Sequence, residues 1–151
     1  MPHIHEKIDF TVSCYIVHDQ KVLLVDHREL KKWLPIGGHI ELDEDPDQAL
    51  QREIKEECGL QVEIVGEKPD MNSPGTKFLY RPSGINIHDI NTTHRHTVLV
   101  YYGRALTFEP KLQGDEHAAI RWFSRDDLHE PKFAIKPEVI FYCEEALRVV
   151  Q

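Results

Sequence analysis

The chain has 151 residues, 40% of them hydrophobic and 29% charged, which suits a single domain whose core needs no disulfide bonds. The 26 acidic and 18 basic residues give a net charge of −8, which disfavours a nucleic-acid-binding protein because phosphate contacts need clustered Lys and Arg. The sequence also disfavours membrane and secreted proteins: no apolar run nears the roughly 20 residues of a membrane span, no signal core is present, and three widely spaced cysteines favour a cytoplasmic location.

Alternating and β-branched residues predict a mixed β-sheet. The first two strands form a hairpin around the turn at 18–20, and the turn-rich segment 33–38 excludes a helix. Strands are predicted at 11–17, 21–25, 61–65, 97–106 and 120–123, with a short one near 85–87; loops are predicted at 68–75 and over most of 81–93.

Two main helices accompany these strands. Asp45 and Gln48 can form a capping box that starts a helix over 46–58, and Gly59 can end it in the left-handed conformation. Pro137 opens a final helix. Its apolar face holds Val139, Cys143, Ala146 and Val150. The expectation is one α/β domain spanning residues 1–151.

Three carboxylates stand out on the first helix. Glu53, Glu56 and Glu57 occupy positions i, i+3 and i+4, so they share one helix face and repel one another. A hard divalent cation such as Mg²⁺, with Mn²⁺ as a substitute, would relieve that repulsion because both prefer oxygen ligands. The alternative is a solvated acidic face relieved by Arg52 and Lys55.

The segment around these carboxylates resembles the Nudix box, G-x5-E-x7-R-E-U-x-E-E-x-G-U, in which U is a bulky aliphatic residue. Two glycines, Gly37 and Gly38, precede the helix and allow close approach of the backbone to a ligand. All nine specified positions match: Gly38, Glu44, Arg52, Glu53, Ile54, Glu56, Glu57, Gly59 and Leu60.

Sequence outside the box is similar to the same MutT-like family. Trp33 and the Leu34-Pro35 pair resemble the usual lead-in, and 121–123 followed by 126–128 resembles the closing strand and turn. The resemblance implies an α/β/α sandwich around a mixed sheet. It also implies a Mg²⁺-dependent pyrophosphohydrolase, in which water attacks a diphosphate phosphorus of a small nucleoside diphosphate-type substrate.

The resemblance assigns metal binding to Glu53, Glu56 and Glu57, with a backbone carbonyl of Gly37 or Gly38 as a further ligand. Glu53 and Glu57 are then also catalytic. How many metal ions bind is left open by the sequence.

Two further roles follow from the family pattern. Arg52 would hold a catalytic glutamate in place, and Glu44 would fix the same network. The general base in the family is either a box glutamate or one from a later loop. Glu116 lies where that later residue is often found and is a candidate ligand or base, with Asp115 as its rival.

Substrate choice is not encoded in the box. Candidate substrate-binding residues are Arg28, His39, Phe78, Tyr80 and His96. Trp33 and Tyr101 are expected in the core instead. His88, His94 and His96 form a histidine-rich group that either binds a transition metal or, as is more usual, is exposed or touches substrate. Many family members are dimers, which leaves a homodimer open.

Two other functions exist on this scaffold. One is a non-catalytic nucleotide-binding Nudix module, which has no need of the hydrolytic carboxylates found here. The other is a prenyl-diphosphate isomerase, which uses its own arrangement of Cys and Glu. The complete box favours hydrolysis over both.

Overall fold

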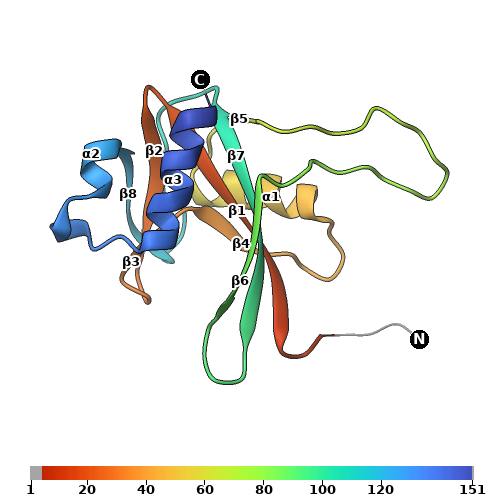
Figure 1. The fold of residues 1–151 in the computed structure, drawn as a ribbon, viewed down its shortest axis with the longest axis horizontal. Coiled ribbons are helices and arrows are strands. Elements are labelled where there is room, and N and C mark those ends of the chain that lie inside the picture. Colours follow the sequence, from red (N-terminus) through yellow and green to blue (C-terminus); the bar gives the residue numbers. More distant parts are fainter. Residues whose placement is uncertain (1–4, 151) are drawn as a thin grey trace.

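The computed structural model describes residues 5–150 and forms a mixed sheet with helices on both sides (Figure 1). Within that range no helix has the length and apolarity needed to cross a membrane. The elements in chain order are β1 (Ile8–His18), β2 (Lys21–His27), β3 (Lys32–Leu34), β4 (Ile36–His39), α1 (Pro46–Glu57), β5 (Val62–Ile64), β6 (Gly84–Asp89), β7 (Arg95–Ala105), β8 (His117–Ser124), α2 (Arg125–Leu128), the 3-10 turn η1 (Pro131–Phe133) and α3 (Pro137–Val149).

Strand β1 lies at the centre of the sheet. It runs parallel to β7 along most of its length, and this pair is the sheet's parallel contact. On its other edge, β1 pairs antiparallel with β4 near its start and with β2 at its end. β2 carries β3 and β8, while β7 carries β5 and β6, all antiparallel. The predicted mixed sheet is therefore confirmed.

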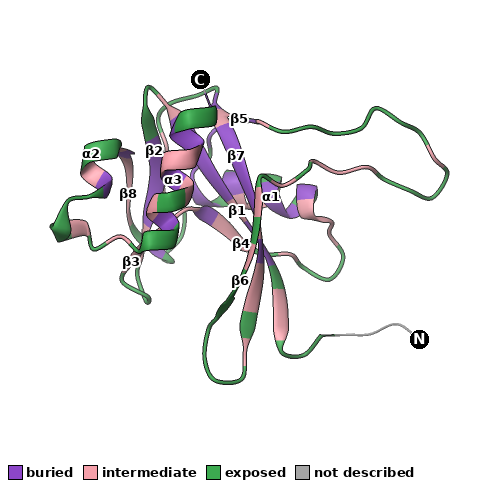
Figure 2. Cartoon of the chain, viewed as in Figure 1, coloured by how far each residue is buried: buried purple, intermediate pink, exposed green. Residues whose placement is uncertain are grey.

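Alternate residues of the central strands face two separate apolar clusters, as the period-two pattern requires. Val12, Cys14 and Ile16 of β1 pack with the buried face of α1 in the first cluster. Tyr15 and Val17 pack with α3 in the second. Figures 1 and 2 show α3 in front of the sheet, α1 behind it, and the buried residues between these layers. The expected α/β/α arrangement is confirmed.

Local sequence accounts for the start and end of α1. Asp45 accepts a hydrogen bond from the Gln48 amide at 2.9 Å, and the Gln48 side chain accepts one from the Asp45 amide at 2.9 Å. The helix stops at Cys58, and Gly59 follows with φ of +68°, a conformation that favours glycine. The capping box and the left-handed glycine are both confirmed.

The segment 33–38 differs from the expectation of an irregular turn. It contains β3 and β4, and Gly37 of β4 faces Ser13 of β1. A Cβ on Gly37 would overlap the Val12 carbonyl oxygen, so the tight pairing depends on glycine here. Long-range strand pairing thus overrides a local pattern rich in Pro and Gly. Four strands also begin earlier in the chain than predicted: β1 at Ile8, β6 at Gly84, β7 at Arg95 and β8 at His117.

Candidate active site

Arg52 on α1 connects the residues of the box. Its guanidinium grips Glu44 with two donors, Nε to Oε2 at 3.0 Å and Nη2 to Oε1 at 2.6 Å. The remaining donors reach Glu53 Oε1 at 2.8 Å, Glu56 Oε2 at 3.2 Å and the His39 carbonyl at 2.9 Å. A planar guanidinium is suited to such a fork, which a Lys ammonium cannot reproduce. The helix, the loop before it and the end of β4 are thereby held together.

Glu44 and Gly38 complete this arrangement. Glu44 also accepts a hydrogen bond from the Glu41 amide at 3.0 Å. The Arg52 hydrogen bond and this backbone contact hold the pKa of Glu44 below its ordinary value. A Cβ on Gly38 would overlap the carboxylate of Glu53. The glycine therefore makes room for a box glutamate against β4, a more specific reason than the general backbone approach inferred from sequence.

Glu57 is the most buried of the three box glutamates. Its side chain is 6% exposed, and within residues 5–150 its Oε2 has no hydrogen-bonding partner. Burial, followed by the nearby Glu53, raises the pKa of Glu57, and burial also raises that of Glu53. An unpartnered buried carboxylate oxygen is costly, so this site is complete only when a cation or proton joins it.

Two histidines and a further glutamate lie beside Glu57. His117 Nε2 is 3.7 Å from Glu57 Oε2, and its side chain is only 4% exposed. His27 Nε2 is 3.5 Å from Glu116 Oε1, and the His27 and His117 rings meet edge-on. The ligand atoms of His27, Glu116 and His117 all lie within 4.8 Å of one another. Burial lowers the pKa of His117, which favours a neutral imidazole there.

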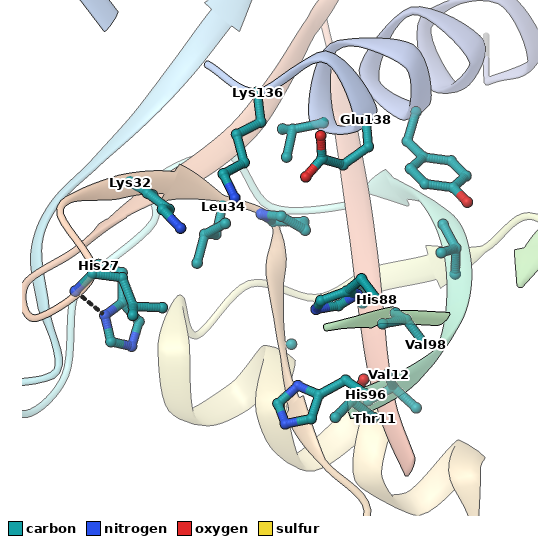
Figure 3. Close-up of a pocket in the computed structure, with 18 of the residues that line it drawn as sticks. Thr11, Val12, His27, Lys32, Leu34, His88, His96, Val98, Lys136 and Glu138 are labelled. Atoms are coloured by element: carbon teal, nitrogen blue, oxygen red, sulfur yellow. Dashed lines mark hydrogen bonds between the residues drawn. The ribbon is translucent and has the colours of Figure 1, made fainter. Parts of the chain in front are cut away.

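These groups border a cleft of about 420 Å³ on the α3 side of the sheet. Its lining includes Glu57, Gly37, Gly38 and Glu116. Figure 3 shows Lys136 extending from the start of α3 toward Lys32 of β3, and His88 and His96 in another part of the same cleft.

Two lysines, Lys32 and Lys136, line the cleft together with Glu138, which offsets part of their positive charge. Lys136 holds the pKa of Lys32 below its ordinary value, because the two side chains are close to one another. Two adjacent ammonium groups facing a cleft favour an anionic ligand.

The structure brings together most of the residues singled out from the sequence. The network around Arg52 contains Glu44, Glu53 and Glu56. The cleft lining contains Gly37, Gly38, His39, Glu57, His96 and Glu116.

Other sequence candidates lie apart from the cleft lining. Arg28 donates to the backbone carbonyls of Asp115 at 2.9 Å and His117 at 3.4 Å, so it braces the segment that carries Glu116. Tyr80 packs against the α1 side of the core beneath Lys68. Phe78 lies two residues earlier in the same loop, and neither it nor Tyr80 is among the described residues that line the cleft.

Of the two aromatic residues expected in the core, Tyr101 is buried, whereas Trp33 is only partly buried against the second cluster. Tyr101 is 1% exposed in the first cluster, and Trp33 packs edge-on against Phe123 and Phe133.

Sequence reasoning missed several residues of the site. His27 and His117 belong to strands β2 and β8, and they meet because Leu23–His27 pairs with the strand that starts at His117. Lys32 and Lys136 are 104 positions apart and meet only through tertiary packing. The predicted strand begins only at residue 120 and leaves His117 outside it, and no local pattern links any of these four side chains to the box.

The comparisons with known proteins agree with this geometry. Residues 7–143 match the family model described as the NUDIX domain, and the chain belongs to the Nudix family of hydrolases. The resemblance inferred from the box is confirmed by a match that extends far beyond its 23 residues.

Two solved structures of Nudix hydrolases are similar to this chain in both sequence and fold. A crystal structure of a Nudix-family hydrolase from Clostridium perfringens is 36% identical, with 95% of this chain and 98% of that chain covered and a TM-score of 0.83. A MutT Nudix hydrolase from Burkholderia pseudomallei is 25% identical, with 97% and 100% covered and a TM-score of 0.69.

A curated protein of Lactococcus lactis subsp. cremoris, described as a probable DHNTP pyrophosphohydrolase, is 29% identical over 69 residues. That alignment spans 46% of this chain and 42% of the relative, so the likeness covers less than half of either protein.

Proposed function

We propose that this protein is a Mg²⁺-dependent pyrophosphohydrolase that cleaves the diphosphate linkage of a nucleoside diphosphate-type substrate. The buried Glu57 carries this proposal, because its Oε2 is unpartnered among residues 5–150 and lies next to other acidic groups. A cluster of this composition fits a hard cation with oxygen ligands. The partial likeness to a probable pyrophosphohydrolase supports the same reaction class.

Glu53, Glu56 and Glu57 would hold the cation, with Glu116 at the edge of the site. When bound, the cation supplies charge neutralisation for the diphosphate and makes a water molecule more acidic. Arg52 keeps Glu53 and Glu56 at fixed positions through the bonds described above. Because Glu44 takes two of the guanidinium donors, the arginine itself is held in one orientation.

Other residues of the cleft would handle the substrate and the proton. Lys32 and Lys136 would bind anionic oxygens of the diphosphate, since both line the cleft. Water adds to one phosphorus while the bridging P–O bond breaks, and a carboxylate takes the proton of the water. Glu116 is suited to that transfer because its side chain is 65% exposed at the cleft, whereas Glu57 is enclosed.

The isomerase alternative is not supported by the cysteines. Cys14, Cys58 and Cys143 are all buried in the two apolar clusters, and burial raises the pKa of each thiol. A buried protonated thiol is poorly placed for chemistry on a substrate. The site also disfavours a non-catalytic nucleotide-binding module, because nucleotide binding does not require a buried, unpartnered glutamate.

A substrate panel tests the proposal. Purified tag-free protein would be mixed with nucleoside triphosphates, ADP-ribose, dinucleoside polyphosphates and nucleotide sugars, and release of phosphate or pyrophosphate would be measured with and without Mg²⁺. We expect Mg²⁺-dependent cleavage of at least one class. Tight nucleotide binding without turnover on any member would favour the binding module instead. The single domain, the cytoplasmic location and a homodimer stay predictions.

A further inference from the structure

A second group of potential ligands, which contains no box glutamate, borders the cleft through His39 and His96. Asp9 Oδ2 is 2.7 Å from His94 Nε2, 3.2 Å from His39 Nε2 and 3.6 Å from His96 Nε2. The ligand atoms of Asp9, His94 and His96 all lie within 4.8 Å of one another. Three imidazole nitrogens thus surround a single carboxylate oxygen. This oxygen has only two lone pairs with which to accept hydrogen bonds.

Sheet register creates this convergence. Asp9 of β1 and His96 of β7 are paired residues on neighbouring parallel strands. His94 lies in the turn one residue before β7, and its ring reaches the same Asp9 carboxylate. His39 of β4 pairs with Thr11, which is two residues after Asp9 on β1. Asp9, His39 and His96 therefore come from three neighbouring strands, whereas His94 lies in the turn directly before β7, where its carbonyl accepts hydrogen bonds from the Ile90 amide at 2.9 Å and the Asn91 amide at 3.2 Å.

The backbone around the cluster is fixed on each side. The Arg95 amide donates to the Lys7 carbonyl at 2.9 Å, and the Ile40 amide donates to the Phe10 carbonyl at 2.9 Å. The carbonyl of His39 accepts a bond from Arg52 at 2.9 Å. His39 consequently connects the arginine network to Asp9, with its backbone on one side and its ring on the other.

The donor set differs in kind from that of the box. Imidazole nitrogens with one carboxylate favour first-row transition metals such as zinc, whereas Mg²⁺ takes oxygen ligands. Ligand atoms around a tetrahedral zinc ion at roughly 2.0–2.1 Å are about 3.3 Å apart. The distances from Asp9 Oδ2 to His94 Nε2 and His96 Nε2, 2.7 and 3.6 Å, lie on both sides of that spacing. Only small side-chain shifts would be needed.

We propose that Asp9, His94 and His96 form a binding site for a divalent transition-metal ion of the zinc class, with His39 holding the Asp9 carboxylate in place. Three protein ligands leave at least one coordination position open. Since His96 and His39 line the cleft, that position faces the space where a substrate would lie. An anionic oxygen of the ligand in the cleft is the group it would accept. Metal binding at this site does not depend on the proposed hydrolysis.

Metal titration tests the site. Zinc chloride would be titrated into tag-free protein by calorimetry in the presence of saturating Mg²⁺, which occupies the oxygen-rich end. Wild-type protein should bind zinc, and Asp9→Asn and His94→Gln should each weaken binding by about 100-fold or more, since loss of supporting partners alone costs about 10–100-fold. His129→Gln is the matched control, because His129 also contacts a carboxylate, Glu144 at 2.6 Å, far from the cleft. It should bind zinc as wild type does.

A second comparison separates the two candidate metal positions. His117→Gln removes a nitrogen near Glu57 and should leave the high-affinity zinc event in place. If His117→Gln abolishes zinc binding while His94→Gln does not, zinc binds beside His117 and not between Asp9, His94 and His96, and the proposal fails. Absence of wild-type binding at micromolar zinc would also overturn it. Two different variants and melting curves for each guard against misfolding, and cobalt titration provides a visible-absorption signature of nitrogen ligation.

Discussion

The glutamate end and the histidine end of the cleft differ in how their charges are balanced without a metal. At the glutamate end, Glu53 and Glu57 are 12% and 6% exposed, and burial raises the pKa of both. At the histidine end, Asp9 is 37% exposed and hydrogen-bonded to His94, which lowers its pKa. The first end is electrostatically incomplete when empty, whereas the second already has partners. Removing metal should therefore affect the two ends differently.

The largest effect should follow removal of divalent cations. EDTA should abolish hydrolysis, and Mg²⁺ or Mn²⁺ should restore it, because the oxygen-rich end suits hard cations. Initial rates on the best substrate of the panel would be measured before and after metal replacement. Full turnover by EDTA-treated protein would show that the glutamates are not a metal site. If zinc alone restores hydrolysis, the catalytic ion would be assigned to the histidine end of the cleft instead.

Glu57→Gln should reduce the rate by about 10²–10³-fold, the usual magnitude for one electrostatic contribution to the transition state. Gln keeps the size and helix propensity of Glu but removes a buried ionisable group whose charged form is unfavourable there, so the metal-free Tm should be equal or slightly higher. Glu130→Gln, an exposed substitution, serves as the control.

Asp9→Asn supplies the contrast with Glu57→Gln at the other end of the cleft. It should lower the metal-free Tm, because it removes the partner of His94.

If Glu57→Gln retains more than a third of the wild-type rate, the loss is below 1 kcal/mol. Glu57 would then not be a catalytic ligand.

Arg52→Lys should decrease kcat by about 10- to 100-fold, in line with the ~1.5–3 kcal/mol of a hydrogen bond to a charged group. The Lys variant keeps the positive charge but loses the bidentate grip on Glu44. Arg148→Lys on the exposed side of α3 is the matched control. An unchanged kcat for Arg52→Lys would show that Arg52 does not position the catalytic glutamates. A change confined to KM would indicate that Arg52 contacts the substrate.

The smallest effect concerns stability against pH in the metal-free protein. Because the folded pKa of Glu57 is raised, its contribution to stability is full below the ordinary Glu value and is lost as pH rises. Asp9 behaves oppositely: its folded pKa is lowered, so its contribution is present above pH ~3.9 and is lost as pH falls.

The difference in unfolding free energy between wild type and Glu57→Gln isolates the Glu57 effect. Measured in EDTA, it should shift against wild type by at most about 1.4 kcal/mol per pH unit from pH 5 to 8. A difference independent of pH would mean that Glu57 is not held in a buried, unfavourable state.

The two ends also differ in how far the sequence could predict them. The glutamate end depends on helical spacing and on a 23-residue motif, so Arg52, Glu53 and Glu57 were expected to lie together from local geometry alone. The capping box at Asp45 is local in the same way. Their catalytic roles stay predictions.

The histidine end depends on register between distant strands. Asp9 of β1 and His96 of β7 are far apart in the sequence and lie opposite one another only because β1 and β7 pair in one register. A one-residue slip would send the two side chains to opposite faces, and nothing local fixes that choice. The sequence singles out the histidines near residue 94, but no local pattern marks Asp9 as their partner. The local sequence likewise predicts a turn at Gly37, because the feature that requires glycine there is the β1 backbone opposite it.

Crystals soaked separately in Mn²⁺ and Zn²⁺ would test the two-ended cleft most directly, with anomalous scattering used to locate each ion. The account predicts manganese against Glu53, Glu56 and Glu57, and zinc between Asp9, His94 and His96. Manganese elsewhere, with no ion against the box glutamates, would contradict the assignment of the hydrolytic site. Zinc found only beside His117 would contradict the second site.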